Sequence, residues 1–251
     1  MSEGHDERTA EQRRMWEQKP TLRAIYADFH RRLEAACPPG RLLDIGGGSA
    51  HFKDYRPDVV SLDIVRFPGI DVVADAHRLP FREATFAGIV MLDVLHHLQR
   101  PLVFLREAAR VLAPGGRLAM IEPGMSRVAR HVYRRFHHEP VDMSADPFAT
   151  GQALSSADPW GSNQAIPSLM FATRAAIARV EADVPSLAVL RAEWLSLLAY
   201  PLSGGFQRWS LCPGPLVKPL LAVEERLRGP LGRTFGFRQM IVLEKRSPAA
   251  T

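Results

Sequence analysis

The chain has 251 residues, of which 46% are hydrophobic and 24% are charged, which excludes an intrinsically disordered chain. Its length fits a single α/β domain with insertions. The formal net charge of +5 would suit anionic partners. However, the basic residues are spread along the chain, which favours a solvated surface over a nucleic-acid-binding face.

Cysteine usage and hydropathy bear on the cellular setting. Cys37 and Cys212 lie in unrelated contexts and match no metal or redox spacing, which favours a reduced, cytoplasmic setting. Residues 1–19 are charged and polar, and the chain contains no run of about 18 apolar residues. The sequence therefore predicts neither secretion nor a membrane span.

Residues 1–36 are predicted to form a helical cap, because apolar positions recur at helical spacing on both sides of Pro20. Short apolar runs then alternate with longer amphipathic stretches. The runs are residues 41–45, 59–64, 70–74, 86–92 and 117–122. Such alternation predicts βαβ units, a mostly parallel sheet and helices on both of its faces. An amphipathic helix is predicted over 102–112, ending at the Pro-Gly-Gly of 114–116.

The regular alternation fails after Gly124, and residues 124–165 are predicted to be an insertion, since structureless loops of that length are unusual. A helix is predicted over 168–183, followed by strands over 187–195 and 239–245. Residues 197–236 form a second predicted insertion, with an amphipathic piece at 216–227. The division of the chain is therefore 1–36 cap, 37–123 core, 124–165 insertion, 166–196 core, 197–236 insertion, and 237–251 last strand and tail.

A glycine cluster follows the first predicted strand. Ligands of open parallel sheets bind beyond the carboxyl ends of the strands, where strand order reverses. Gly46, Gly47 and Gly48 permit positive φ and let a ligand approach backbone N–H groups. A glycine triplet alone does not separate a ligand loop from a tight turn without a ligand.

Acidic residues end three successive predicted strands. Asp44 needs a partner such as backbone donors or a cationic ligand group. Asp63 is placed to accept both hydroxyls of a ribose, and Asp75, with the amide of Ala76, is placed to read an adenine edge. Each alone is also an ordinary strand-end cap, but three in succession favour a ligand site.

A dinucleotide site is the obvious rival for the glycine loop. The Gly-x-Gly-x-x-Gly fingerprint would need glycine at the position of His51, and a pyrophosphate is disfavoured beside Asp44. The pattern is instead Asp-x-Gly-x-Gly-x-Ala, from Asp44 to Ala50. It resembles the class I S-adenosylmethionine (SAM)-dependent methyltransferases, particularly the small-molecule group called type 11 or UbiE-like.

Several segments carry this resemblance, in the family's order, between residues 41 and 122. They are LLDIGGG at 42–48, SLDI at 61–64, ADA at 74–76 with LPF at 79–81, VLHHL at 94–98 and EAARVLAPGG at 107–116. Ala50 departs from the family's pattern, where the last motif residue is glycine.

The resemblance implies a Rossmann-like fold with a seven-stranded, mostly parallel sheet, and SAM as cofactor. It makes 37–123 the SAM-binding core, with the glycine loop on the methionine moiety, Asp63 on the ribose and Asp75 on the adenine. The implied cofactor-binding residues are Asp44, Gly46, Gly47, Gly48, Asp63, Ile64, Asp75, Ala76 and Asp93.

Candidates for a general base follow the fourth and fifth predicted strands. Because the sulfonium of SAM is already a good electrophile, alignment supplies much of the acceleration, and a base is needed only for a hydroxyl acceptor. His96 and His97 follow the fourth strand and Glu122 ends the fifth, so these three are the candidate catalytic residues. In the family such a histidine pair also serves structure or simply lines the pocket.

A second polar cluster heads the first insertion: His131, His137, His138 and Glu139. The spacing of six between His131 and His137 does not place them on one helical face, and no second pair at metal spacing appears, so we predict no metal site and favour substrate contact or a polar loop. Arginines precede it at near-helical spacing, at 127, 130, 134 and 135. They fit either an anion-binding group or a solvated helix face.

The second insertion is rich in aromatic residues and leucine, with Arg208 and Lys218 among them. It fits a cover over the active site, a peripheral contact between 197–236 and a lipid surface, or plain core packing. Either of the first two predicts an apolar or lipid-linked acceptor.

The leading hypothesis is an enzyme that methylates an oxygen or carbon of a small-molecule or lipid-like acceptor. The alternatives are a nucleic-acid (RNA) methyltransferase and a non-catalytic SAM-binding regulatory protein. The sequence has Leu92-Asp93-Val94-Leu95 where many amino-methylating enzymes carry Asn/Asp-Pro-Pro-Tyr/Phe, and it shows no RNA-binding appendage. We therefore expect no nucleic-acid partner.

Overall fold

The computed structural model describes residues 3–49, 51–137, 139–149 and 161–247. Two positions discussed above, Ala50 and His138, lie outside the described residues, as does part of the first predicted insertion, 150–160.

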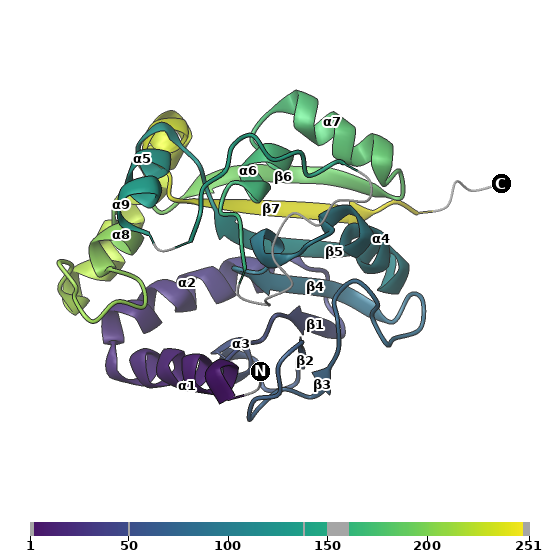
Figure 1. Ribbon diagram of the computed structural model, residues 1–251, viewed down its shortest axis with the longest axis horizontal. Helices are drawn as coiled ribbons and strands as arrows, with labels where there is room; N and C mark the ends of the chain where they lie inside the picture. Colours follow the sequence, from purple (N-terminus) through teal and green to yellow (C-terminus); the bar gives the residue numbers. More distant parts are fainter. Residues whose placement is uncertain (1–2, 50, 138, 150–160, 248–251) are drawn as a thin grey trace.

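A seven-stranded sheet with the order β3-β2-β1-β4-β5-β7-β6 forms the centre of the molecule (Figure 1). Neighbours among β1 to β5 pair in parallel, and β7 is antiparallel to both β5 and β6. The strands are β1 (Leu42–Ile45), β2 (Val60–Asp63), β3 (Val72–Val73), β4 (Phe86–Leu92), β5 (Leu112–Pro123), β6 (Leu187–Leu195) and β7 (Arg238–Lys245). The predicted Rossmann-like, mostly parallel sheet is confirmed.

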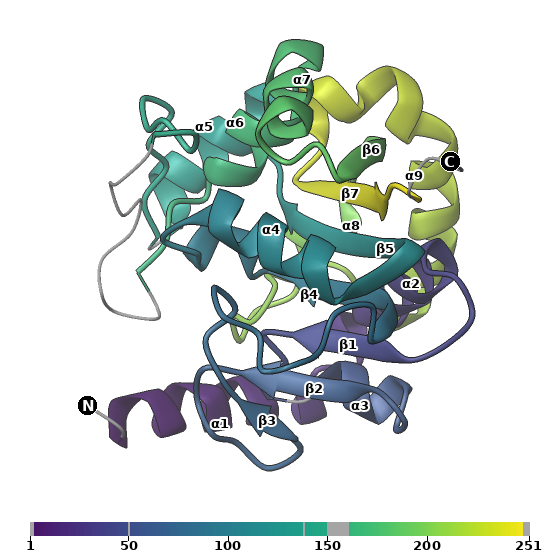
Figure 2. The same cartoon turned by 90° about the vertical axis from the view of Figure 1, so that its right-hand side faces the viewer.

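Helices cover both faces of this sheet (Figure 1, Figure 2). One face packs against α1 (Glu3–Gln18), α2 (Pro20–Ala36), α3 (His51–Tyr55), α8 (Ala199–Ser203) and α9 (Gly214–Phe235). The other packs against α4 (Pro101–Val111), α6 (Ile166–Phe171) and α7 (Arg174–Asp183). Because both faces are buried, the central strands read as continuous apolar runs rather than alternating ones.

Within the predicted cap, residues 3–36 form the two helices α1 and α2, with Pro20 in the first turn of α2, where its missing N–H costs no hydrogen bond. The first insertion contains α5 (Arg127–Phe136), which begins where Ser126 Oγ accepts a hydrogen bond from Ala129 N. None of the helices in the described part of the chain combines the length and apolar character needed to cross a membrane.

Three predicted elements have the wrong extent. The helix predicted over 102–112 forms as α4, but the strand predicted over 117–122 begins already at Leu112, and β5 runs through the Pro-Gly-Gly as a bulge where the pairing with β4 shifts register. The helix expected over 168–183 is two helices, because Thr173 Oγ1 caps α7 at Ala176 N. In the run 70–74 only Val72–Val73 pairs as a strand.

The second insertion is more helical than its sequence suggests. The amphipathic piece expected at 216–227 belongs to α9, which continues through Pro219 and Pro230. Lys19, at the start of α2, connects the cap to the loop that precedes α9. Its ammonium donates to the carbonyl oxygens of Gly205, Gln207 and Trp209 in that loop, at 2.7, 2.7 and 2.8 Å. The loop is thereby held over one end of the sheet.

Candidate functional site

A cavity of about 980 Å³ opens beyond the carboxyl ends of β1, β2 and β4. This is the point of the sheet where strand order reverses, since β1 lies between β2 and β4. Its lining includes all the residues predicted to bind the cofactor: Asp44, Gly46, Gly47, Gly48, Asp63, Ile64, Asp75, Ala76 and Asp93. It also includes His96 and His97, but not Glu122.

The glycine loop after β1 is fixed to β2 and open to the cavity. The amides of Gly46 and Gly47 donate to Leu62 O at 2.8 and 3.1 Å. Gly46 has a φ of +73°, and a Cβ there would lie 2.2 Å from Cγ2 of Val94. A Cβ on Gly48 would meet only Gly46 O, at 3.8 Å, so the space above Gly48 is free for a ligand.

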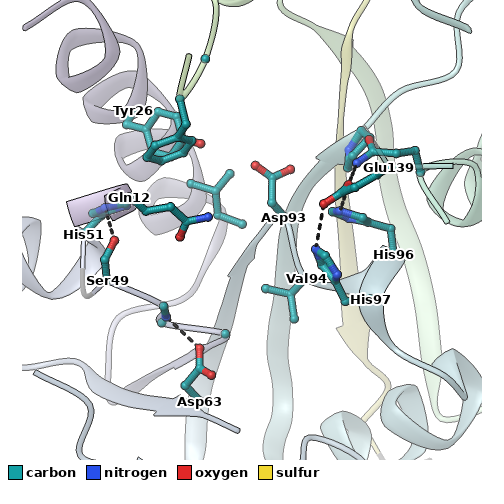
Figure 3. Close-up of a pocket in the computed structure, with 18 of the residues that line it drawn as sticks. Gln12, Tyr26, Ser49, His51, Asp63, Asp93, Val94, His96, His97 and Glu139 are labelled. Carbon is teal, nitrogen blue, oxygen red and sulfur yellow. Dashed lines mark hydrogen bonds and ion pairs between the residues drawn. The ribbon is translucent and has the colours of Figure 1, made fainter. Parts of the chain in front are cut away.

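Asp63, at the end of β2, faces this loop (Figure 3). Its Oδ2 accepts from Gly48 N at 2.8 Å, and its Oδ1 accepts from Val65 N at 2.9 Å. Burial raises the pKa of Asp63, and these backbone hydrogen bonds oppose that rise. A carboxylate offers about four acceptor positions, so Asp63 keeps acceptor capacity for a ribose hydroxyl.

Asp44 and Asp75 occupy different environments. Asp44 is 5% exposed, and its Oδ2 accepts from Ser61 Oγ at 3.2 Å. Burial raises the pKa of Asp44 to about 7, so a cationic ligand group would favour its ionised form. Asp75 is held at the edge of the cavity, where Oδ1 accepts from His77 N at 2.8 Å and pairs with His77 Nδ1. Ile64 is 53% exposed and offers an apolar surface to a flat ring.

Glu122 is fully buried beneath the short 3₁₀ helix η1 (Leu95–His97). Its Oε1 accepts from the amides of Val94 and Leu95, both at 2.8 Å, and its Oε2 lies 2.7 Å from His96 Nδ1. These contacts favour a positioning role for Glu122 over the predicted role as a base.

His96 and His97 differ in charge. Burial alone would lower the pKa of His96, but the carboxylates of Glu122 and Glu139 raise it to about 10, so His96 is not a neutral base at pH 7. Burial, and then the charge of His96, lower the pKa of His97 to about 4. His97 is therefore neutral at pH 7, as a base must be.

Glu139 joins this pair, although the sequence grouped it with His131 and His137. His96 Nε2 lies 3.6 Å from Glu139 Oε2, and His97 Nε2 lies 4.0 Å from Glu139 Oε1 (Figure 3). His131 lies exposed on α5, whereas His137 Nδ1 accepts from Glu139 N at 3.2 Å. The arginines at 127, 130, 134 and 135 are all exposed on α5, as the solvated-face interpretation requires.

Sequence reasoning missed Arg238, the first residue of β7. It is 3% exposed, forms an ion pair with Asp93 and places its guanidinium carbon 4.1 Å from the ring centroid of Tyr200. Asp93 itself has a φ of +60°, a conformation that costs a non-glycine residue energy and is held here by its surroundings. The pair forms part of the cavity wall.

Aromatic side chains line the part of the cavity beneath the cap and the second insertion. The ring of His51 stacks against Trp16 at 4.3 Å and against Phe206 at 5.8 Å. Burial lowers the pKa of His51 to about 3, so its ring is neutral. Tyr26, Tyr200 and Trp209 also line the cavity.

Residues 43–120 match the family described as "Methyltransferase domain". The bovine protein named "Probable tRNA methyltransferase 9B" is 36% identical over 107 residues, which cover 37% of this chain and 24% of that protein. The 27-O-demethylrifamycin SV methyltransferase of Amycolatopsis mediterranei is 49% identical over 71 residues, or 28% of this chain and 24% of that protein. The chain thus spans about a quarter of the length of these two relatives.

Among solved structures, a SAM-dependent methyltransferase from Thermotoga maritima superimposes with a TM-score of 0.56 at 16% identity, over 97% of this chain and 99% of that one. This likeness concerns the fold alone. The fold, the residues matched between 43 and 120 and the cavity at the switch point agree with one another. Residues 43–120 thus match a methyltransferase domain, and the described chain has the fold of class I SAM-dependent methyltransferases, whose cofactor is SAM.

Proposed function

We propose that the protein transfers the methyl group of SAM to an oxygen or carbon of a small-molecule or lipid-like acceptor and releases S-adenosylhomocysteine. The observation that carries this proposal is the composition of the cavity. Beside the strand ends that suit SAM, its walls include aromatic side chains from α2 and the second insertion, such as Tyr26, Phe206 and Trp209. Apolar and aromatic walls with a few polar groups are typical of small-molecule sites.

Methylation of RNA is the second candidate, because three of the relatives carry the name "Probable tRNA methyltransferase 9B". The family match ends at residue 120. The aromatic walls lie outside it, on α2 and on residues 197–236. We therefore prefer the small-molecule or lipid-like acceptor.

Exposed apolar side chains on the second insertion support a lipid-like acceptor. Leu216, Val223, Leu227 and Leu231 recur along α9 at helical spacing and are 37–55% exposed. Lys218 and Arg226 are exposed on the same helix. Apolar residues with basic neighbours suit a peripheral contact with an anionic lipid surface, and we propose that residues 197–236 make this contact.

Asp63→Ala should weaken SAM binding at least about 10-fold, or about 1.4 kcal/mol. The substitution removes the acceptor for the ribose hydroxyls and also the partner of Gly48 N. Calorimetry with SAM measures the change. Asp58→Ala is the control, because Asp58 is an exposed aspartate that pairs only with Arg56 among the described ion pairs. Unchanged affinity in Asp63→Ala would remove the ribose assignment.

Incubation with methyl-labelled SAM and a fractionated cell extract should place the label in a lipid or small-molecule fraction. Asp63→Ala, which should bind SAM weakly, serves as the control and shows how much labelling occurs without the cofactor site. Label in the RNA fraction would replace our proposal with the second candidate, and no label in any fraction would favour a non-catalytic SAM-binding protein. If lipid is labelled, sedimentation with anionic vesicles should separate the wild-type chain from Leu216→Asp, which should remain in the supernatant.

A further inference from the structure

Three side chains of metal-ligating type converge on one wall of the cavity. One ligand atom from each of His96, His97 and Glu139 lies within 4.8 Å of the others. Figure 3 shows both imidazole rings facing the carboxylate of Glu139. We propose that these residues bind one divalent first-row transition-metal ion, and we take Zn²⁺ as the reference ion.

The spacing of the ligand atoms suits one shared ion. Zinc bonds to imidazole nitrogen and carboxylate oxygen are about 2.0–2.2 Å long, so two ligands at a tetrahedral angle stand roughly 3.4 Å apart. The observed separations are 3.6 Å from Glu139 Oε2 to His96 Nε2 and 4.0 Å from Glu139 Oε1 to His97 Nε2. All three ligand atoms lie within 4.8 Å of one another, so closing onto an ion shortens these separations by about 1.4 Å at most.

The residues behind the ligands hold them in place. Glu122 Oε2, 2.7 Å from His96 Nδ1, fixes the proton on that nitrogen and directs Nε2 toward Glu139. Carboxylate–histidine–metal arrangements of this kind orient the imidazole and raise its basicity as a ligand. Gln164, which is 3% exposed, donates from Nε2 to Glu139 Oε2. The cluster is thus a supported arrangement rather than a chance meeting of surface side chains.

Charge and coordination both favour a dication. Binding at His96 Nε2 requires the ion to displace the second proton that His96 carries at pH 7. With both imidazoles then neutral, Glu122 and Glu139 give the cluster a charge of −2, which one divalent ion neutralises. Two histidines and one glutamate also form the ligand set of zinc sites that keep a coordination position open. Because all three ligands line the cavity, the open position would face it. The use of that position to hold an acceptor oxygen rests on the proposed function, whereas metal binding itself does not.

The test uses the 251-residue chain without a histidine tag, stripped with a chelator and re-equilibrated with Zn²⁺. We expect about one Zn²⁺ per chain after gel filtration, measured by elemental analysis. Replacing Zn²⁺ with Co²⁺ should give visible d–d absorption bands, because the positions and intensities of these bands depend on the ligands and geometry around the ion. His97→Ala and Glu139→Gln should each weaken Zn²⁺ affinity at least 10-fold. His131→Ala, which alters an exposed histidine on α5, should leave the affinity unchanged.

Circular dichroism establishes that each variant is folded, and the Co²⁺ spectrum of the wild-type chain tests the site even if one variant is not. Zinc binding that survives both His97→Ala and Glu139→Gln, or a wild-type chain that retains no Zn²⁺, would overturn the proposal. In the latter case the histidine-carboxylate cluster holds a proton instead of a metal. Calorimetry with SAM runs in parallel, so a failure of the metal site is distinguishable from a failure of the cofactor site.

Discussion

Gly46→Ala should lower the affinity for SAM at least about 100-fold, or about 2.7 kcal/mol. An added Cβ would lie 2.2 Å from Cγ2 of Val94 and 3.0 Å from its Cγ1, so either the loop or η1 has to move. The φ of +73° adds a cost of about 1–2 kcal/mol for any residue with a Cβ. Both effects displace the glycine loop, which we predict to hold the methionine moiety. Calorimetry with SAM gives the affinity, and thermal unfolding reports the stability.

Gly115→Ala is the matched control for this substitution. Gly115 has the same φ of +73°, but a Cβ there would meet nothing within 4 Å. It lies in the bulge of β5, away from the cavity lining. We expect it to lose stability through backbone strain alone and to bind SAM normally. Equal SAM affinities in the two variants would contradict the role of the glycine loop as a fitted cradle.

The cofactor half of the site could be predicted because parallel strands bring their carboxyl ends to one edge. Asp44, Asp63 and Asp75 lie far apart in the sequence, but each follows a short apolar run, and βαβ connections place such positions side by side. All three line the cavity. Their predicted contacts with SAM remain predictions.

The rest of the site, around His96 and Asp93, depends on contacts between residues that are distant in the sequence. Local sequence patterns do not predict such contacts. Glu139 meets His96 across the fold, and Arg238 meets Asp93 from the opposite end of the chain. Both contacts depend on how the first insertion and the antiparallel β7 pack beside η1. The sequence held one indication of the second contact. Arg238 directly precedes an apolar predicted strand, and an arginine buried there needs a partner because an unpaired buried charge is costly.

The predicted extents of two helical segments were wrong, one for a local reason and one because of tertiary packing. Thr173 is the N-cap of α7, but the helical spacing of apolar residues continues on both sides of it. That spacing therefore predicted one helix and gave no indication of the break at 172–173. The amphipathic piece predicted over 216–227 is part of the longer α9, which contains Pro219 and Pro230. Helix α9 packs along α2 and β6, and such tertiary contacts override the local penalty of a proline.

Glu122→Gln should destabilise the fold by about 3 kcal/mol, within the range measured when one partner of a buried ion pair is removed. The carboxylate is fully buried and accepts from the amides of Val94 and Leu95 and from His96 Nδ1. A glutamine of nearly the same shape has one acceptor oxygen in place of two, so at least one of these donors loses its partner. Urea unfolding in the presence of a chelator measures the change without any contribution from bound metal.

Glu244→Gln is the control with which the loss of stability in Glu122→Gln is compared. Glu244 also lies on a central strand and pairs with Arg117 at 2.8 Å, but the two side chains are 32% and 34% exposed. Exposed pairs contribute at most about 1 kcal/mol, so its loss should be small. If Glu122→Gln cost no more stability than Glu244→Gln, Glu122 would not be the anchor of η1. A large stability loss with SAM affinity retained would instead identify it as the anchor that holds η1, and with it His96 and His97, at the edge of the cavity.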